Sequence, residues 1–193
     1  MNKDIYINDE NITFDIKENE TLNIFHYMYN KSVNVVINLN GENAKVNYHF
    51  STINLDDNIF KIVVNHNSEN TESNIYNHGV NVNDNKLTFD ITGLVPKNAS
   101  KCIVNQENQI INLSDGTSLI KPNLLIRNFD TFSNHAAYIG KFKDELLFYL
   151  MSRGITFNKA NELLMESLLI NNGNKDELVV KEFINKLMEV NHG

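Results

Sequence analysis

The stretch VVINLNGENAKVNYHF, from Val35 to Phe50, decides the fold of this chain. Two short segments in it, Val35–Leu39 and Val46–Phe50, alternate apolar with polar residues, and the residues between them are mostly Asn, Gly and Glu. Alternation with a period of two is the pattern of a β-strand with one buried face, whereas Asn and Gly are typical of turns. The stretch therefore predicts two short strands joined by a tight corner.

The same pattern recurs until about residue 140. Further strands are expected at Ile59–Val64, Lys86–Ile91, Ile110–Leu113 and Asn123–Ile126. Because no helical pattern separates these segments, a doubly wound α/β fold is disfavoured. Two all-β architectures remain, which are a β-solenoid and a sandwich or barrel. The strand starts are irregularly spaced, and the sequence shows no strict repeat that would decide between them.

The composition favours the solenoid, because 35 of the 193 residues are Asn. Asn tolerates the left-handed backbone that tight corners need, and stacked Asn side chains form ladders between neighbouring coils. A coding sequence rich in A and T is the alternative explanation, which the presence of only two Arg also fits. The net charge of −7 argues against a nucleic-acid partner, and the single Cys excludes a disulfide framework or a Cys-rich metal site within one chain.

After residue 140 the apolar period becomes helical. Asp144 to Gly154 begins with acidic residues and ends in Gly, as helices do. Asn158 is the expected cap of a second helix. Asp176 opens a third, whose apolar face is expected to carry Leu178, Phe183, Ile184, Leu187 and Met188. The expected organisation is a β domain over residues 1–139 and a small helical domain over 140–193, which is too small for a large core of its own and must pack on the β domain or on a partner.

The beginning of the chain has no basic segment followed by an apolar one, so no signal peptide is expected. No apolar run is long enough to span a membrane. These two observations predict a cytoplasmic protein without a membrane partner.

Several segments carry a family resemblance. The first is Asn134–Gly140, followed by Glu145–Ile155 with its Phe-Tyr-Leu-Met-Ser-Arg-Gly block, and the segments Ile110–Asp115 and Lys121–Ile126 precede it. His66, Thr71, Ser73, Gly79, Val80, Gly93 and Gln106 follow in the same order as in the family. Over residues 59–169 the chain resembles the SufB/SufD family of the SUF system for iron–sulfur cluster assembly. It looks more like SufD than SufB, and it is shorter than most chains of either kind.

This resemblance implies a right-handed parallel β-helix followed by a C-terminal helical domain. It also implies a non-catalytic scaffold that holds a transient Fe–S cluster. The implied partners are a SufC-like ABC ATPase, bound through the C-terminal helices, and a SufB-like chain or a second copy of this chain, paired through strands near residues 100–135. No Walker A motif is present, so no nucleotide is expected on this chain.

The resemblance also suggests site residues. His135 matches a SufD-type histidine near the cluster, and neutral imidazole is a good iron ligand; a structural histidine at a strand-to-helix junction is the alternative. Glu107 stands where SufB-like chains carry a cysteine, so it is either a weak iron ligand or a solvated turn residue. Cys102, the only thiol, lies in a strand-like setting and is either a buried, inert side chain or a ligand shared across a symmetric dimer.

The Phe-Tyr-Leu-Met-Ser-Arg-Gly block supplies the expected contacts with the ATPase. The residues proposed for partner binding are Phe148, Tyr149, Leu150, Arg153 and Gly154. Phe148, Leu150 and Met151 are equally expected as core residues. Two other functions stay open: a degenerate β-helix that only dimerises, and a polysaccharide-binding β-helix, which the scarcity of Arg and the absence of Trp disfavour.

Overall fold

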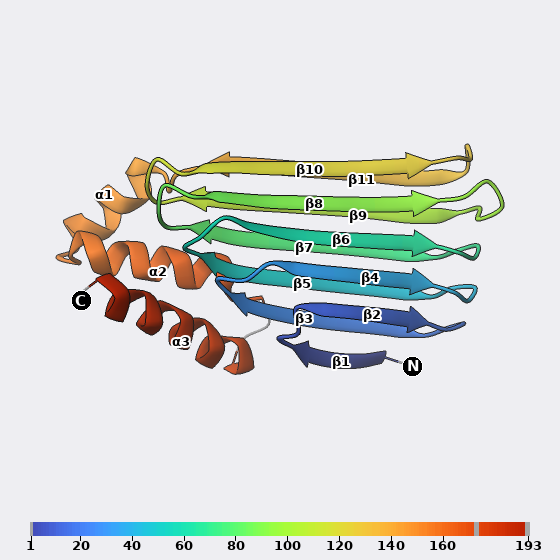
Figure 1. Ribbon diagram of the computed structural model, residues 1–193, viewed down its shortest axis with the longest axis horizontal. Coiled ribbons are helices and arrows are strands. Elements are labelled where there is room, and N and C mark those ends of the chain that lie inside the picture. The colour runs from blue at the N-terminus through green and yellow to red at the C-terminus, as the bar shows by residue number, and fades with distance from the viewer. Residues whose placement is uncertain (1, 172–173, 192–193) are drawn as a thin grey trace.

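Two parallel sheets, which the chain enters alternately, form the body of the protein (Figure 1). The computed structural model describes residues 2–171 and 174–191. The strands within them are β1 (Asn2–Ile7), β2 (Asn11–Ile16), β3 (Thr21–Tyr29), β4 (Val33–Leu39), β5 (Lys45–Asn54), β6 (Asn58–His66), β7 (Glu72–Asn81), β8 (Lys86–Val95), β9 (Cys102–Asn112), β10 (Thr117–Ile126) and β11 (Thr131–Gly140).

Odd-numbered strands form sheet A and even-numbered strands form sheet B, each in unbroken order along the chain. Each pair of neighbouring strands in these sheets is parallel, as β3 with β5 and β4 with β6 illustrate. The chain thus winds from one sheet to the other and back, and Figure 1 shows the coils stacked from β1 to β11. This is a parallel β-helix; the sandwich or barrel alternative was wrong.

The coils differ in length, which explains why the sequence shows no fixed repeat. Asn2 pairs with Thr21, which lies 19 residues further along the chain. Glu72 pairs with Ile103, which lies 31 residues further. Most of the difference comes from longer strands, since β1 and β2 have 6 residues each whereas β7 and β8 have 10 each. Register is kept inside the sheets while the sequence period drifts.

The core lies between the two sheets. Phe50 of sheet A stacks on Phe60 of sheet B, with 3.7 Å between the ring centroids, and Phe89 packs edge-on against both. Each strand has one face towards this interior and one towards the outside, so parallel strands keep the alternating pattern of a half-buried sheet. This geometry explains why the alternating pattern of Val35–Phe50 correctly predicted two strands.

Asparagines occupy corners of the β-helix, as their abundance predicted. The non-glycine residues with positive φ in the described part of the chain are Asn19, Asn30, Asn43, Asn70 and Lys101. Four of these five are Asn, the side chain that best tolerates a left-handed backbone after Gly. The expected role of Asn in the corners is therefore confirmed.

A ladder of Asn side chains also runs up the outer face of sheet A. Asn47 donates from Nδ2 to Oδ1 of Asn23 at 2.8 Å, Asn74 donates to Asn47 at 2.9 Å, and Asn105 donates to Asn74 at 2.9 Å. Each bond joins register partners in neighbouring coils. The predicted stacking of Asn is confirmed, and each such bond contributes about 1 kcal/mol.

The helices α1 (Asp144–Ser152), α2 (Phe157–Leu169) and α3 (Asn174–Asn191) follow the last strand. Figure 1 shows them gathered along one side of the stack of coils, where the strands of sheet A end. Met165 of α2 and Phe183 of α3 share an apolar cluster with Phe25, Ile53 and Val80 of sheet A. These two helices therefore form a second apolar cluster with sheet A, separate from the core between the two sheets.

Two details of the helix prediction were wrong. The cap of α2 is Thr156, whose hydroxyl oxygen accepts from the Lys159 N–H at 3.4 Å, rather than Asn158. Leu178 of α3 is exposed, and Val180 is buried in its place. Within the described residues, no helix combines the length and apolar character needed to cross a membrane.

Candidate functional site

The last coil of the β-helix, formed by β10 and β11, is open on one side. β10 pairs with β8 and β11 pairs with β9, and each is the outermost strand of its sheet. Most residues of β11 are exposed, and large apolar side chains gather here without cover. They are Leu125, Phe129, Phe132, Tyr138 and Ile139.

His135 lies in the middle of β11, not at a strand-to-helix junction. It pairs in register with Gln106, whose side chain is buried in the interior. Because register partners in parallel sheets face the same side, His135 is directed towards the open end of the core. Its ring is exposed because no further coil covers it.

Glu107 lies within β9, so the turn interpretation was wrong. It is exposed and pairs with Ala136 on the outer face of sheet A. Successive residues of a strand point to opposite faces, so Glu107 and His135 lie on opposite sides of the same sheet. The structure does not bring these two predicted ligands together.

Cys102 is 1% exposed, which agrees with the buried-thiol interpretation. Its Sγ lies 3.2 Å from the Thr71 hydroxyl, which is 2.8 Å from Nδ1 of His66. Burial lowers the pKa of His66 to about 4, so the ring stays neutral in this network. Cys102 pairs with Thr131, four residues before His135, which separates them by about 13 Å along the strand. The thiol and the imidazole are thus two separate features.

A patch of buried amides lies below His135. Asn77 donates from Nδ2 to Oδ1 of Asn108 at 2.7 Å, and Asn108 donates to the Ala136 carbonyl oxygen at 3.4 Å. Gln106 donates from Nε2 to the Asn123 carbonyl oxygen at 3.3 Å. The interior is therefore apolar in the middle coils and polar beneath the open end. Sequence reasoning missed Asn77 and Asn108, although each stands at an inward position of an alternating strand.

Two histidines on the outer face of sheet A lie near carboxylates. Burial lowers the pKa of His78, and the charge of Glu107 partly opposes this change. Burial and the neighbouring His78 lower the pKa of His49, while Asp176 of α3 raises it. His49 also stacks on Tyr76 at 4.9 Å between centroids. Across residues 2–171 and 174–191, no group of three or more His, Cys, Asp or Glu is arranged to hold a metal ion.

The helix α1 buries none of its residues, so the expectation that Phe148, Leu150 and Met151 are core was wrong. Phe148 is 75% exposed, and Tyr149 and Met151 are also exposed. The guanidinium of Arg153 lies 5.2 Å from the centre of the Tyr149 ring. Gly154 ends the helix with φ of 85°, which favours glycine.

A groove of about 460 Å³ separates α1 from the last coil. Tyr138 and Gln109 line it from sheet A, and Leu146 lines it from α1. The Phe-Tyr-Leu-Met-Ser-Arg-Gly block thus presents an apolar surface beside the open end of the β-helix.

The comparisons with known proteins agree with this arrangement. The family model described as "SUF system FeS cluster assembly, SufBD core domain" matches residues 6–168. The chain belongs to the SufBD family. It is also 35% identical over 82 residues to the iron–sulfur cluster assembly protein SufD of Bacillus subtilis (strain 168). That match covers 42% of this chain and 19% of the relative, so the chain aligns with only a small part of that protein.

The buried hydrogen-bond network around His66 contains residues that resemble the family pattern. The ordered His, Thr and Ser that resemble the SufBD pattern are buried, with His66 Nε2 2.9 Å from the Ser73 hydroxyl and Nδ1 2.8 Å from Thr71. These residues satisfy one another inside a corner of the coil. This part of the SufBD pattern therefore has a structural explanation.

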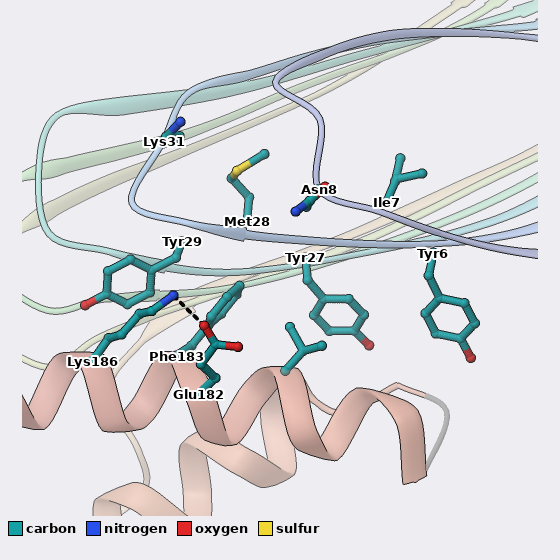
Figure 2. Close-up of a pocket in the computed structure, with 11 residues that line it drawn as sticks. Tyr6, Ile7, Asn8, Tyr27, Met28, Tyr29, Lys31, Glu182, Phe183 and Lys186 are labelled. Atoms are coloured by element: carbon teal, nitrogen blue, oxygen red, sulfur yellow. Dashed lines mark ion pairs between the residues drawn. The ribbon is translucent and has the colours of Figure 1, made fainter.

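A second groove lies at the other end of this SufBD chain, between α3 and the first coils (Figure 2). It has a volume of about 540 Å³. Tyr6 and Tyr27 project towards α3, where Lys186 is paired with Glu182 at 2.6 Å (Figure 2). None of the site residues expected from the sequence lines this groove. Sequence reasoning missed it because it joins segments more than a hundred residues apart.

Proposed function

We propose that this chain is a non-catalytic scaffold subunit in iron–sulfur cluster assembly. It pairs through its last coil with a second β-helix, either a SufB-like chain or another copy, and binds a SufC-like ABC ATPase through α1. The open, uncharged edge at β11 is the observation that carries the proposal. Membership in the SufBD family supports the cluster-assembly setting.

The two ends of the β-helix are protected differently. At the first coil, the edge strand β1 carries Lys3 and Asp4, and β2 carries Asp15. At the last coil, β10 carries Lys121, whereas β11 contains no Lys, Arg, Asp or Glu. Charged residues on an edge strand discourage pairing with other chains, and their absence leaves a template for pairing. The difference supports β11 as the face that meets another β-helix.

The exposed apolar side chains of α1 support the second contact. A helix whose apolar residues stay in water gains stability when a partner covers them, at about 25 cal/mol for each Å² removed from water. Phe148, Tyr149 and Met151 form this surface. Leu150 is half-buried, and Arg153 is exposed at the end of the helix. The same residues were expected to bind the ATPase because of their resemblance to the family motif.

The cluster itself is the cargo of such a scaffold. His135 offers an imidazole at the rim of the last coil, and imidazole nitrogen ligates iron. A cluster there needs further ligands, which inorganic sulfide and the paired chain would supply. The buried Cys102 and the outward-facing Glu107 do not point to this position.

Co-expression with a SufC-like ATPase tests the proposal. We expect the two chains to co-elute in size exclusion, and we expect Phe148→Asp to release the ATPase. Leu178→Asp is the matched control, because Leu178 is equally exposed on α3. Separate elution of the wild-type chains, with and without ATP, contradicts ATPase binding.

A dimerisation platform without a cluster is the second candidate. The absence of a ready three-ligand group in the described residues favours it. Anaerobic reconstitution of the paired complex with iron and sulfide separates the two. Visible absorbance that is lost in His135→Ala supports the cluster scaffold, whereas no bound cluster in the wild type supports the platform.

A further inference from the structure

Gln106 has a buried amide oxygen without a hydrogen-bond partner among the described residues. The side chain is 3% exposed, and its Nε2 donates to the carbonyl oxygen of Asn123. A carbonyl oxygen only accepts hydrogen bonds, so the amide cannot be turned the other way. Oε1 is therefore the amide atom that has no hydrogen-bond partner among the described residues, and buried amide oxygens rarely lack one.

The amide of Gln106 lies at the level of the last coil. Asn123, which it reaches, belongs to β10, and His135 belongs to β11 of the same coil. Gln106 and His135 are also register partners on the inward face of sheet A. A Cβ on Gly93 would lie 3.3 Å from Gln106 Nε2 and 2.8 Å from Val104, so the glycine leaves room for the amide.

His135 supplies the complementary group. A neutral imidazole has one N–H donor and one nitrogen with a free lone pair. Histidines that bind metals usually donate the other N–H to an acceptor, which fixes the tautomer and the direction of the ring. Gln106 Oε1 is the neighbouring buried acceptor that needs a donor.

We propose that Gln106 is a positioning residue for His135: its Oε1 accepts the imidazole N–H and leaves the second ring nitrogen for iron. The inference rests on the proposed function of His135 as a ligand. A partner that covers the last coil strengthens the bond, because it excludes the water that now reaches the exposed ring. Gln106 itself does not touch the metal.

Nuclear magnetic resonance of the imidazole tests the bond without any cluster. At pH 8, above the usual pKa range of histidine, the ring ¹⁵N shifts report which nitrogen carries the proton. We expect Gln106→Met to move the His135 shifts towards those of a freely exchanging imidazole. Gln109→Met, on the outer face of the same strand, is the matched control and leaves them unchanged. Gln106→Leu serves if Gln106→Met does not fold.

Iron retained after anaerobic reconstitution of the paired complex is the second readout. Loss of such an outer acceptor typically weakens metal binding about 10-fold to 100-fold, so we expect Gln106→Met to retain at least about tenfold less iron at limiting iron. Unchanged ¹⁵N shifts in both Gln106 variants overturn the positioning role. Full iron content in His135→Ala overturns the proposed function instead, and the ¹⁵N result still decides whether the bond exists.

Discussion

Backbone conformation at single corner residues determines how well consecutive coils stack. Asn19, Asn43, Asn70 and Lys101 all have positive φ, and each donates its backbone N–H to a carbonyl of the next coil. Three of these four are Asn, and the fourth is Lys, which has no side-chain amide to bond the local backbone. Position 101 is therefore the weak member of an otherwise uniform column.

Lys101→Asn is expected to stabilise the protein by about 0.5–1 kcal/mol, because Asn adopts the left-handed region at lower cost than Lys. The free energy of unfolding in urea measures the change. Lys97→Asn is the matched control, since Lys97 is an exposed loop residue without positive φ. Equal effects of the two substitutions would contradict the role of backbone conformation.

The buried histidines predict a dependence of stability on pH. Burial lowers the pKa of both His26 and His66 from 6.5 to about 4 in the folded protein. Between these values the unfolded chain binds more protons, so stability is complete above pH 6.5 and is lost as the pH falls towards 4. At 1.36 kcal/mol for each pKa unit, full acidification costs roughly 3 kcal/mol per histidine.

Urea unfolding between pH 7.5 and 4.5 measures this loss. We expect a flatter profile in His66→Gln, which has no proton to bind on unfolding at that position. If the urea concentration at the wild-type midpoint were the same at pH 7.5 and pH 4.5, these rings would have the same pKa in the folded and unfolded states.

Among the secondary-structure elements, the helices α1 and α3 have opposite surroundings. Phe183 of α3 is 7% exposed and lies 5.4 Å from the Tyr29 ring, whereas Phe148 of α1 is in contact mainly with water. Both helices show comparable apolar patterns in sequence. The pattern therefore identified helices but not which of them already has a partner.

Phe183→Ala and Phe148→Ala form a matched pair. We expect Phe183→Ala to cost about 3–5 kcal/mol, because it leaves a cavity between α3 and sheet A. We expect Phe148→Ala to change the stability of the isolated chain by less than about 0.5 kcal/mol. Thermal or urea unfolding measures both, and a large loss in Phe148→Ala would mean that α1 is part of the folded core.

The sequence predicted strands well where a strand alternates clearly, as Val33–Leu39 does, and it missed β1, β2, β3, β7 and β11. In β3 the run from Ile24 to Met28 is buried on both faces, because α2 and α3 cover the outside of sheet A there. Because the helices cover the outer face, β3 does not alternate between apolar and polar residues. No local sequence pattern shows that distant helices will pack there. His135 could be found from its motif, whereas its inward direction and the position of Glu107 on the other face depend on the register between distant strands.

At the scale of the whole molecule, stability is unevenly distributed along the stack of coils. A middle coil such as β5 with β6 has a neighbour on both sides, and its interior holds Phe50 and Phe60. The last coil has one neighbour and a half-exposed interior. In stacked repeats, stability is approximately a sum of terms for each coil and each interface, so a coil with one interface opens more easily.

Hydrogen exchange measured by mass spectrometry tests this gradient. We expect amides of β10 and β11 to exchange faster than those of β5 to β8, because opening the last coil breaks one interface rather than two. When a second β-helix pairs with β11, its N–H groups gain acceptors and the interior is covered, so protection should rise most at residues 131–140. Uniform protection along the isolated chain would show that the β-helix opens as one cooperative unit. If protection rose only in α1 on pairing, the contact would lie at α1 and not at the edge strand β11.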